Sequence, residues 1–465
     1  MVTNNRTKTK IQLGVVAIGM LLLSPALRSG QEADSLEKVA QAILAKGLSE
    51  QGAFGVLAKI CGVGPRLTGS PQAAAAVALT QDLMKELGFD RVWTEPVEVS
   101  HWIRGEEDVR LVSSSAGSVP LAACALGGSV GTPEDGISAE VLQVRTFEEL
   151  RKAGSAAKGK IIFFDRTWDQ SQPETFAAYG PMAQQRAAGA VEAARAGGVA
   201  ALVRSASTSR DDLPHTGLMH YDQAAVKVPA AALSPLAADK LEEALKLDPA
   251  VRVFLRLDCR TEAPVVSANV IGEIRGSEKP EEVILVAGHL DSWDLGTGAH
   301  DDGAGCAQSI EGLRLIKGLG LRPKRTVRAV LFMDEENGGT GGRAYAESGS
   351  RRAEKHLVAV ESDRGGFLPL GMGLGDQSSF PKFEKYASLL RSVGLCWLRP
   401  GGGGVDIAPL AKAGTIMGGL VPDSQRYFDV HHGGKDVLAE VNPRELELGA
   451  VAMAVLAYVL AQEGI

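Results

Sequence analysis

Cysteine is scarce in this sequence of 465 residues, and its five copies are scattered. They are odd in number and no two of them form a CxxC pair, so a zinc site built from thiolates is not expected. We expect most of the thiols to be small buried side chains. One disulfide is compatible with the sequence, but the sequence does not identify which two cysteines would form it. The cysteines are Cys61, Cys124, Cys259, Cys306 and Cys396.

An excess of basic residues is also absent. The chain has 49 Lys and Arg against 56 Asp and Glu, which gives a formal net charge of −7 at pH 7. Nucleic acids and anionic membrane surfaces attract basic proteins, so this balance argues against both as partners. The length exceeds what one hydrophobic core usually serves, which predicts two domains. Internal repeats are missing, and we interpret the GGGG tract at 401–404 as a flexible loop.

Residues 1–30 contain no acidic residue. Basic residues lie on either side of the apolar run IQLGVVAIGMLLLSPAL, and small residues follow it. This arrangement is typical of a secretory signal peptide cleaved near residues 26–30, and it predicts a secreted or periplasmic protein. Losing the four basic residues of this segment changes the formal charge from −7 to −11. The alternative is an uncleaved segment that anchors the chain in a membrane.

Two stretches of alternating strands and helices follow. Between residues 108 and 262, short apolar strands such as KIIFFDR alternate with Ala-rich helices, which predicts a small α/β module. Its two histidines, His215 and His220, lie in a polar loop and are expected at the surface. From residue 263 a second α/β pattern begins, with strands at VILVA, TVRAVLFM and KHLVAVES and a closing helix over residues 442–462.

Acidic residues and histidines gather at four places in this second α/β pattern. The segments are GHLDSWDLGTGAHDDGAG, FMDEENGG, VESDRGG and FDVHHGGKD, and the first three come directly after predicted strands. Charged side chains beside a core are costly unless they are paired or bind a metal. In an open α/β sheet, sites form outside the carboxyl ends of the strands. We therefore expect the four segments to converge on one site.

The first segment offers an imidazole and several carboxylates. His289 and Asp291 are two residues apart at a strand end, so both side chains leave on the same side. Asp291 can then hold the ring of His289 and fix its tautomer, as is common beside a metal-bound imidazole. Asp301 lies in a glycine-flanked loop, and its two oxygens could bridge two metal ions. Asp302 is expected to make structural hydrogen bonds instead.

The other three segments supply the remaining candidates. Glu335 and Glu336 are adjacent at a strand end and would repel each other without a cation between them. One of them can bind a metal while the other faces the substrate as a general base. Asp363 adds a carboxylate. Of His431 and His432, one completes the metal ligands and the other contacts the substrate or an oxyanion.

The donor atoms are nitrogen and oxygen, without thiolate, which fits Zn²⁺ and leaves Co²⁺ or Mn²⁺ open. Two such ions bring four positive charges, against three ligand carboxylates and two neutral imidazoles. The remaining positive charge suits a hydroxide that bridges the two ions.

These motifs resemble the dizinc exopeptidases of metallopeptidase family 28. The resemblance rests on the order and spacing of the four segments and on GPRLTGS near the start, and it covers most of the chain after residue 30. It implies an α/β fold with a mixed central sheet flanked by helices. It also implies a catalytic domain formed by residues 31–107 and 263–465, with a protease-associated α/β module inserted over residues 108–262.

The resemblance also implies which residues hold the two zinc ions. His432 is chosen over His431 because the ligand of the family stands four residues before an Asp, here Asp436. The HHGGKD segment departs from the family, whose members usually carry Ser or Thr after the ligand histidine. The implied ligands are His289 and Asp363 on one zinc, Glu336 and His432 on the other, and Asp301 between them.

The implied reaction is attack of the metal-bridging hydroxide on a peptide carbonyl. Glu335 would be the general base, and His431 would be a substrate contact. Asp291, which orients His289, is counted with Glu335 among the catalytic residues. Short peptides with free termini would be the substrates, and a homodimer is compatible with the resemblance. Whether the enzyme is an aminopeptidase, a dipeptidase or a carboxypeptidase stays open.

Three alternatives remain. Dizinc amidases that act on N-acyl amino acids share the order of motifs, but they usually carry their extra domain after the acidic clusters, whereas here the insert precedes His289. Glutaminyl cyclases share the fold but are expected to bind one metal. This chain has the ligands for two metals, which argues against a glutaminyl cyclase. A metal-free, receptor-like binding protein would show substituted ligands, and none of the candidate positions is substituted.

Overall fold

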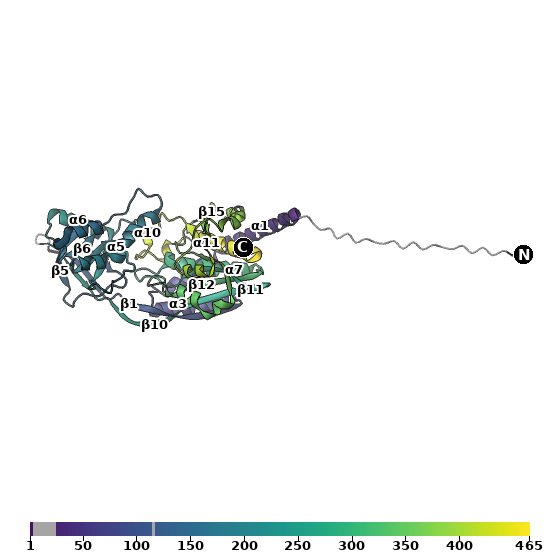
Figure 1. The fold of residues 1–465 in the computed structure, drawn as a ribbon, viewed down its shortest axis with the longest axis horizontal. Coiled ribbons are helices and arrows are strands. Elements are labelled where there is room, and N and C mark those ends of the chain that lie inside the picture. The colour runs from purple at the N-terminus through teal and green to yellow at the C-terminus, as the bar shows by residue number, and fades with distance from the viewer. Residues whose placement is uncertain (3–24, 114–116) are drawn as a thin grey trace.

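The structure is a computed structural model that describes residues 1–2, 25–113 and 117–465. The predicted signal peptide of residues 1–30 therefore lies mostly outside the described residues. Helix α1 (Pro25–Glu50) is the first described element. The chain then forms two α/β units that lie side by side, each around an eight-stranded sheet (Figure 1).

The first unit contains the sheet that carries the candidate site. Strands β12, β11, β13 and β16 run parallel in its middle, and antiparallel pairings occur toward both edges. This confirms the predicted mixed central sheet. In spatial order the strands are β1 (Arg91–Ile103), β10 (Arg260–Ile274), β12 (Arg325–Phe332), β11 (Lys279–His289), β13 (Lys355–Glu361), β16 (Ile416–Pro422), β14 (Pro369–Leu374) and β15 (Trp397–Arg399).

The middle strands of this sheet are buried on both faces. On β11, Ile284 and Val286 pack into the core that contains most of the helices, while Val283 and Leu285 pack into the core on the opposite face. Successive side chains of a strand point to opposite faces, so a nearly continuous apolar run is what a doubly covered strand requires. The covering helices are α2 (Gly52–Gly62), α3 (Pro71–Glu86), α7 (Ala304–Gly318), α8 (Thr340–Glu347), α9 (Ala387–Ser392) and α11 (Pro443–Glu463).

Helix α11 begins where the sequence indicates. The side chain of Asn442 accepts hydrogen bonds from the backbone N–H groups of Arg444 and Glu445, and Pro443 occupies the first helical position. Within the described residues, α11 is the one helix that is long and apolar enough to cross a membrane. Its side chains are almost all buried in the core of the first unit, so packing accounts for its apolar composition.

The second unit comes between β1 and β10 in the sequence. The chain leaves the first sheet at the end of β1 and returns through β10, its antiparallel neighbour. The helices of this unit are α4 (Phe147–Ala153), α5 (Thr175–Arg195) and α6 (Pro235–Leu247). Its strands, in spatial order, are β3 (Gly117–Pro120), β2 (Glu107–Ser113), β9 (Arg252–Leu257), β5 (Ile137–Val144), β6 (Ile161–Phe164), β7 (Ala200–Arg204), β8 (Ala230–Leu233) and β4 (Ala123–Ala125).

The GGGG tract and the five cysteines were both interpreted from the sequence, and the structure places each of them. The GGGG tract at 401–404 is not a free loop, because a Cβ atom on Gly404 would lie 2.1 Å from Cδ of the buried Glu361 side chain. Close packing of backbone against that carboxyl group explains the glycine. The five cysteines are free, and four of them are buried as predicted, while Cys396 is exposed.

Candidate metal centre

The parallel strands β11, β12 and β13 bring three of the acidic segments to one edge of the sheet. His289, the last residue of β11, is paired with Phe332 at the end of β12, and Ala287 is paired with Glu361 at the end of β13. The segments that follow these strands therefore start side by side. The sequence folds this way because each segment comes directly after a buried apolar strand.

Asp301 lies at the centre of the cluster, with one histidine facing each of its oxygens. Nε2 of His289 is 3.2 Å from Asp301 Oδ1 and 3.5 Å from Asp363 Oδ1. Nε2 of His432 is 3.2 Å from Asp301 Oδ2 and 3.2 Å from Glu336 Oε2. The structure thus brings together all five side chains that were predicted as metal ligands.

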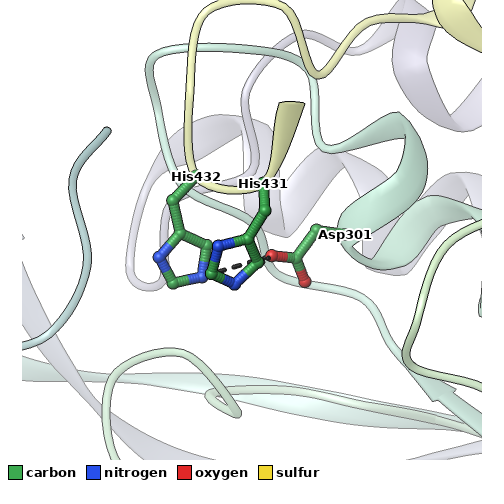
Figure 2. Close-up of side chains that lie close together, drawn as sticks. All are labelled: Asp301, His431 and His432. Carbon is green, nitrogen blue, oxygen red and sulfur yellow. Dashed lines mark ion pairs between the residues drawn. The ribbon is translucent and has the colours of Figure 1, made fainter. Parts of the chain in front are cut away.

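His431 also faces Asp301. Figure 2 shows its ring beside that of His432, and the two rings are stacked with their centroids 3.6 Å apart. Its Nε2 atom is 3.6 Å from Asp301 Oδ2, farther than that of His432. Burial lowers the pKa of His431 well below its usual range, and the neighbouring His432 lowers it further. His431 is therefore a neutral imidazole at the edge of the cluster.

The ring nitrogens on the far side fix the tautomers of the two nearer histidines. Nδ1 of His289 is 3.0 Å from the backbone oxygen of Asp291, and Nδ1 of His432 is 3.2 Å from the backbone oxygen of Thr216. A carbonyl oxygen only accepts, so each Nδ1 carries a proton, and each Nε2 is left to bind either a second proton or a metal ion. Both Nε2 atoms face carboxylate oxygens, which are acceptors.

Acceptors this close to one another need a cation between them. Within the described residues, Asp301 Oδ2 and Glu336 Oε1 are buried and receive no hydrogen bond. Burial by itself would lower the pKa of His289, but its contacts with Asp301 and Asp363 raise that pKa well above the usual range. The same cluster can be neutralised by metal ions instead of protons. The donor set of imidazole nitrogen and carboxylate oxygen fits Zn²⁺.

Asp291 acts through the neighbouring backbone rather than through the ring of His289. Its carboxylate is 3.8 Å from Nδ1 of that ring, whereas its backbone oxygen is at 3.0 Å. The carboxylate accepts hydrogen bonds from the N–H groups of Asp334, Glu335 and Glu336 at 2.8 to 3.2 Å. The carboxylate that was predicted to orient His289 therefore holds the segment that carries the two glutamates.

Glu335 and Glu336 lie in different surroundings, as their adjacent positions at a strand end suggested. Glu336 Oε2 accepts a hydrogen bond of 2.6 Å from Trp293 Nε1, next to His432. Glu335 is partly exposed and forms no side-chain hydrogen bond within the described part of the chain. Burial raises the pKa of Glu335 well above its usual range, and the charges of Asp363 and Glu336 raise it further.

The loop of Asp301 is held by groups far away in the sequence. The carboxylate of Asp436 accepts hydrogen bonds from the N–H groups of His300 (2.6 Å) and Asp301 (3.1 Å). Asp302 accepts from the N–H groups of His289 and Gly305, which are the structural hydrogen bonds predicted for it. The Asp301–Asp302 peptide bond is cis.

Arg66 is a fully buried residue of the site that the sequence analysis missed. Its guanidinium donates to three backbone oxygens of the first acidic segment, those of Leu290 (2.6 Å), Thr297 (2.5 Å) and Gly298 (2.9 Å). Arg66 belongs to the GPRLTGS segment, which was used above only as part of the resemblance. The available signal was an arginine directly after Gly64 and Pro65.

His215 is the clearest correction. It was predicted at the surface but is only 3% exposed, and its Nδ1 atom lies 2.6 Å from the backbone oxygen of His431. The reason is a contact between the two units, in which His215 forms an isolated antiparallel bridge with Gly433. His220 from the same loop is exposed, as predicted. The second unit therefore reaches the candidate site through its residues 215–216.

Comparisons with known proteins show which family this chain resembles. The sequence pattern of Peptidase family M28 matches residues 269–458. Carboxypeptidase Q from Bos taurus is 38% identical over 400 residues, which cover 86% of this chain and 83% of that protein. The crystal structure of a peptidase M28 precursor from Shewanella amazonensis SB2B has a TM-score of 0.89 and 35% identity, covering 93% of this chain and 98% of that one. A zinc aminopeptidase from Bacillus subtilis shares the fold, with a TM-score of 0.65 and 19% identity over 89% of this chain and 96% of its own.

Proposed function

Because this chain belongs to peptidase family M28, we propose that it is a zinc-dependent exopeptidase that hydrolyses short peptides outside the cytoplasm. The family membership that the motifs predicted is confirmed by these comparisons. The observation that carries the finer proposal is the arrangement around Asp301. Two histidines place their Nε2 atoms beside its two oxygens, each 3.2 Å away.

The five converging side chains divide naturally into two ligand sets around Asp301. His289 and Asp363 would hold one zinc ion, and Glu336 and His432 would hold the other, with Asp301 shared between them. Zinc ions bound there would supply Lewis acidity to the scissile carbonyl and to the attacking water.

The residues of the chain itself would hold and move the proton. Glu335 is the one carboxylate of the pair without a hydrogen-bond partner for its side chain in the described residues, and its raised pKa suits a group that takes up a proton. It would accept a proton from the attacking water and pass it to the nitrogen of the leaving amine. Asp291 would keep Glu335 in place through its backbone, and His431 would contact the substrate.

The proposal includes the substrate class and the location. The relatives named carboxypeptidase Q indicate release of a C-terminal residue, which agrees with short peptides that have free termini. The basic and apolar segment at residues 1–30 supports export from the cytoplasm. We further propose that the catalytic domain comprises residues 31–107 and 263–465, and that residues 108–262 are a protease-associated module.

One experiment tests this function directly. The protein purified after export would be assayed for metal content by elemental analysis, and for cleavage of dipeptides, aminoacyl-anilides and N-acetylated amino acids with and without chelator. We expect about two zinc ions per chain, and chelator-sensitive cleavage only of substrates with a free α-amine. Turnover only of N-acetylated amino acids would instead identify an amidase. A protein without metal and without turnover would contradict the proposal altogether.

A further inference from the structure

We propose that Trp293 is a positioning residue, which holds Glu336 as a zinc ligand and makes the affinity for that zinc ion depend on the second unit. The inference deepens the proposed function and rests on it, because Glu336 is a ligand only if zinc binds there. Trp293 lies in the first acidic segment, two residues after Asp291, but its side chain is part of a hydrophobic core of the second unit.

The indole of Trp293 fixes one oxygen of the Glu336 carboxylate. Its Nε1 atom donates a hydrogen bond of 2.6 Å to Oε2, which also lies 3.2 Å from Nε2 of His432. A carboxylate oxygen has more than one lone pair, so Oε2 can accept this bond and still face a cation beside His432. The indole N–H therefore sets the rotation of the carboxylate relative to the histidine of the same ligand set.

This hydrogen bond orients Glu336 without neutralising its charge. Within the described residues, Oε1 of Glu336 is buried and receives no hydrogen bond. The indole has one N–H donor and no charge, so it leaves the negative charge of the carboxylate for a metal ion. A lysine or arginine at the same place would compete with zinc for that charge. A neutral donor beside a ligand carboxylate is how proteins commonly orient a metal ligand.

The second unit sets the position of the indole. Trp293 is only 3% exposed, and its ring meets that of Trp102 edge to face, with the centroids 6.4 Å apart. Nε1 of Trp102 in turn donates to the backbone oxygen of Ser129. A Cβ atom on Gly127 would lie 1.9 Å from Cη2 of Trp293, so backbone of the second unit lies directly against the ring. The indole has no room to move unless this backbone moves too.

The two residues that follow strengthen the same connection. Asp294 accepts two hydrogen bonds from Arg104, at 2.8 and 2.6 Å, and Leu295 packs against another core of the second unit. Residues 293–295 are therefore fixed in the second unit, while the N–H of Trp293 reaches a ligand of the first. A displacement of the second unit would take this donor away from Glu336 and weaken the binding of its zinc ion. By linkage, zinc bound to Glu336 should strengthen the contact between the units.

Trp102 shows what a purely structural tryptophan does in the same core. Like Trp293 it is buried and donates one indole hydrogen bond, but to a backbone oxygen and not to a candidate ligand. The two residues form a matched pair, because replacing either by phenylalanine removes one N–H donor and keeps an aromatic ring. Only the replacement of Trp293 should reach the metal centre.

The test compares the zinc affinities of Trp293→Phe and Trp102→Phe, measured on the purified protein by competition with a chromogenic chelator. In Trp293→Phe, we expect the affinity for one of the two zinc ions to fall by roughly 10- to 100-fold, as is usual when the partner of a metal ligand is removed. Trp102→Phe should keep both affinities, although both variants should lower the free energy of unfolding of the metal-free protein. Gly127→Ala keeps the N–H but displaces the ring, and should weaken the same zinc ion.

Two further measurements assign the effect to Glu336. Glu336→Ala lacks the ligand, so adding Trp293→Phe to it should leave the affinity for the remaining zinc ion unchanged. Zinc binding should also change the fluorescence emission of Trp293. This part of the tryptophan signal should be missing in Trp293→Phe and in Glu336→Ala, and present in Trp102→Phe.

The zinc measurements can contradict the role of Trp293 in several ways. Unchanged affinity in Trp293→Phe, an equal loss in Trp102→Phe, or a further loss when Trp293→Phe is added to Glu336→Ala would each overturn it. An unmodified protein that binds only one zinc ion would do the same, and unchanged affinity in Gly127→Ala would overturn the dependence on the second unit. None of these measurements needs a substrate. A protein that shows the expected zinc affinities but cleaves no peptide would therefore contradict the proposed function and leave the role of Trp293 standing.

Discussion

At the scale of single residues, the two adjacent glutamates should respond differently to the same substitution. Glu336 is in contact with His432 and Trp293, whereas the side chain of Glu335 has no such partner. We expect Glu335→Ala to keep its zinc content but to lose kcat by roughly 10²–10⁴-fold, the usual contribution of a general base. Glu336→Ala should lose one zinc ion, as elemental analysis would show. A Glu335→Ala variant with a kcat near that of the unmodified enzyme would exclude Glu335 as the base.

Asp291 gives a second prediction at this scale. Its buried carboxylate accepts four hydrogen bonds, three from backbone N–H groups and one from the hydroxyl of Thr68. In Asp291→Asn, an amide NH₂ group would face donors, which costs about 1–3 kcal/mol of stability for each group left unsatisfied.

We expect Asp291→Asn to lower both the free energy of unfolding in urea and kcat, since the backbone of Glu335 loses its anchor. Asp294→Asn is a suitable control, because Asp294 pairs with Arg104 and not with this segment. Equal effects of the two substitutions would show that Asp291 has no special role.

His289, Glu336 and Asp363 could be predicted from the sequence because each lies at the end of a buried strand or within a few residues of it. Asp301 and His432 lie in longer loops and were identified from the motifs around them.

The hydrogen-bond partners of these ligands could not be predicted. Arg66 lies more than two hundred residues before the carbonyl groups that it holds, and Thr216 is equally distant from His432. A backbone carbonyl leaves no signal in the identity of its residue, so the group that fixes the tautomer of His432 is invisible in the sequence.

At the scale of elements, residues 215–216 of the second unit should stabilise His432, the proposed zinc ligand. His432 has a φ of 59°, in the left-handed region that residues other than glycine rarely adopt. Two contacts between the units hold it there: the N–H of Thr216 donates to the backbone oxygen of His432, and His215 contacts that of His431.

We expect His215→Ala to weaken the binding of one zinc ion by roughly 10-fold, as is typical when a partner of a metal ligand is removed. Competition with a chromogenic chelator would measure this change. The exposed His220, from the same loop, provides the control: His220→Ala should leave zinc affinity unchanged. Unchanged affinity in His215→Ala would mean that the contact between the units does not support the metal site.

Helices α7 and α11 contain a pair of buried acids that should make stability depend on pH. Burial, together with the charge of the neighbouring Glu311, raises the pKa of Glu447 to about 8. Arg314 pairs with Glu311 and with Glu50, so Glu447 is left without a cation of its own. Its folded-state pKa is above the ordinary value of 4.5, so the folded protein binds the proton more tightly than the unfolded chain.

This contribution to stability is fully present below about pH 4.5 and is lost as the pH rises toward 8. Glu447→Gln mimics the protonated acid at every pH. We therefore expect the variant to become more stable than the unmodified protein as the pH increases between about 5 and 8, measured by urea unfolding. Each comparison uses the same pH for both proteins, so changes at the metal site cancel. A difference that does not vary with pH would contradict the raised pKa.

The long elements could be predicted from the sequence, but the short ones could not. Strands β11, β12 and β13 and helix α11 have clear apolar periods and lie close to their predicted ranges. Strand β15 has only three residues, too few to show any period. The glycines near residue 404 indicated a loop, but their tight packing against Glu361 depends on tertiary structure.

At the scale of the whole molecule, the site joins parts of the chain that are otherwise separate. Three of its segments follow parallel strands of one sheet, and topology alone predicts that they meet. The fourth, with His431 and His432, is held against the second unit by several contacts, among them the bridge between His215 and Gly433 and the ion pair between Lys435 and Asp211. These contacts join residues more than two hundred positions apart, which is why the sequence did not predict that the second unit takes part in the site.

Removing zinc should therefore destabilise the molecule and loosen the contact between its two units. Without a cation, the carboxylates of Asp301, Glu336 and Asp363 repel one another, and the loop of His432 loses its ligand bond. We expect a chelator to lower the melting temperature by several degrees, and added zinc to restore it, because a ligand bound only to the folded state stabilises that state. Hydrogen exchange should then increase at residues 215–217 and 431–434, but not in α11, which is buried in the core of the first unit. In Glu336→Ala the shift caused by the chelator should be smaller. Exchange that stays unchanged at residues 215–217 would show that the second unit holds its position without the metal.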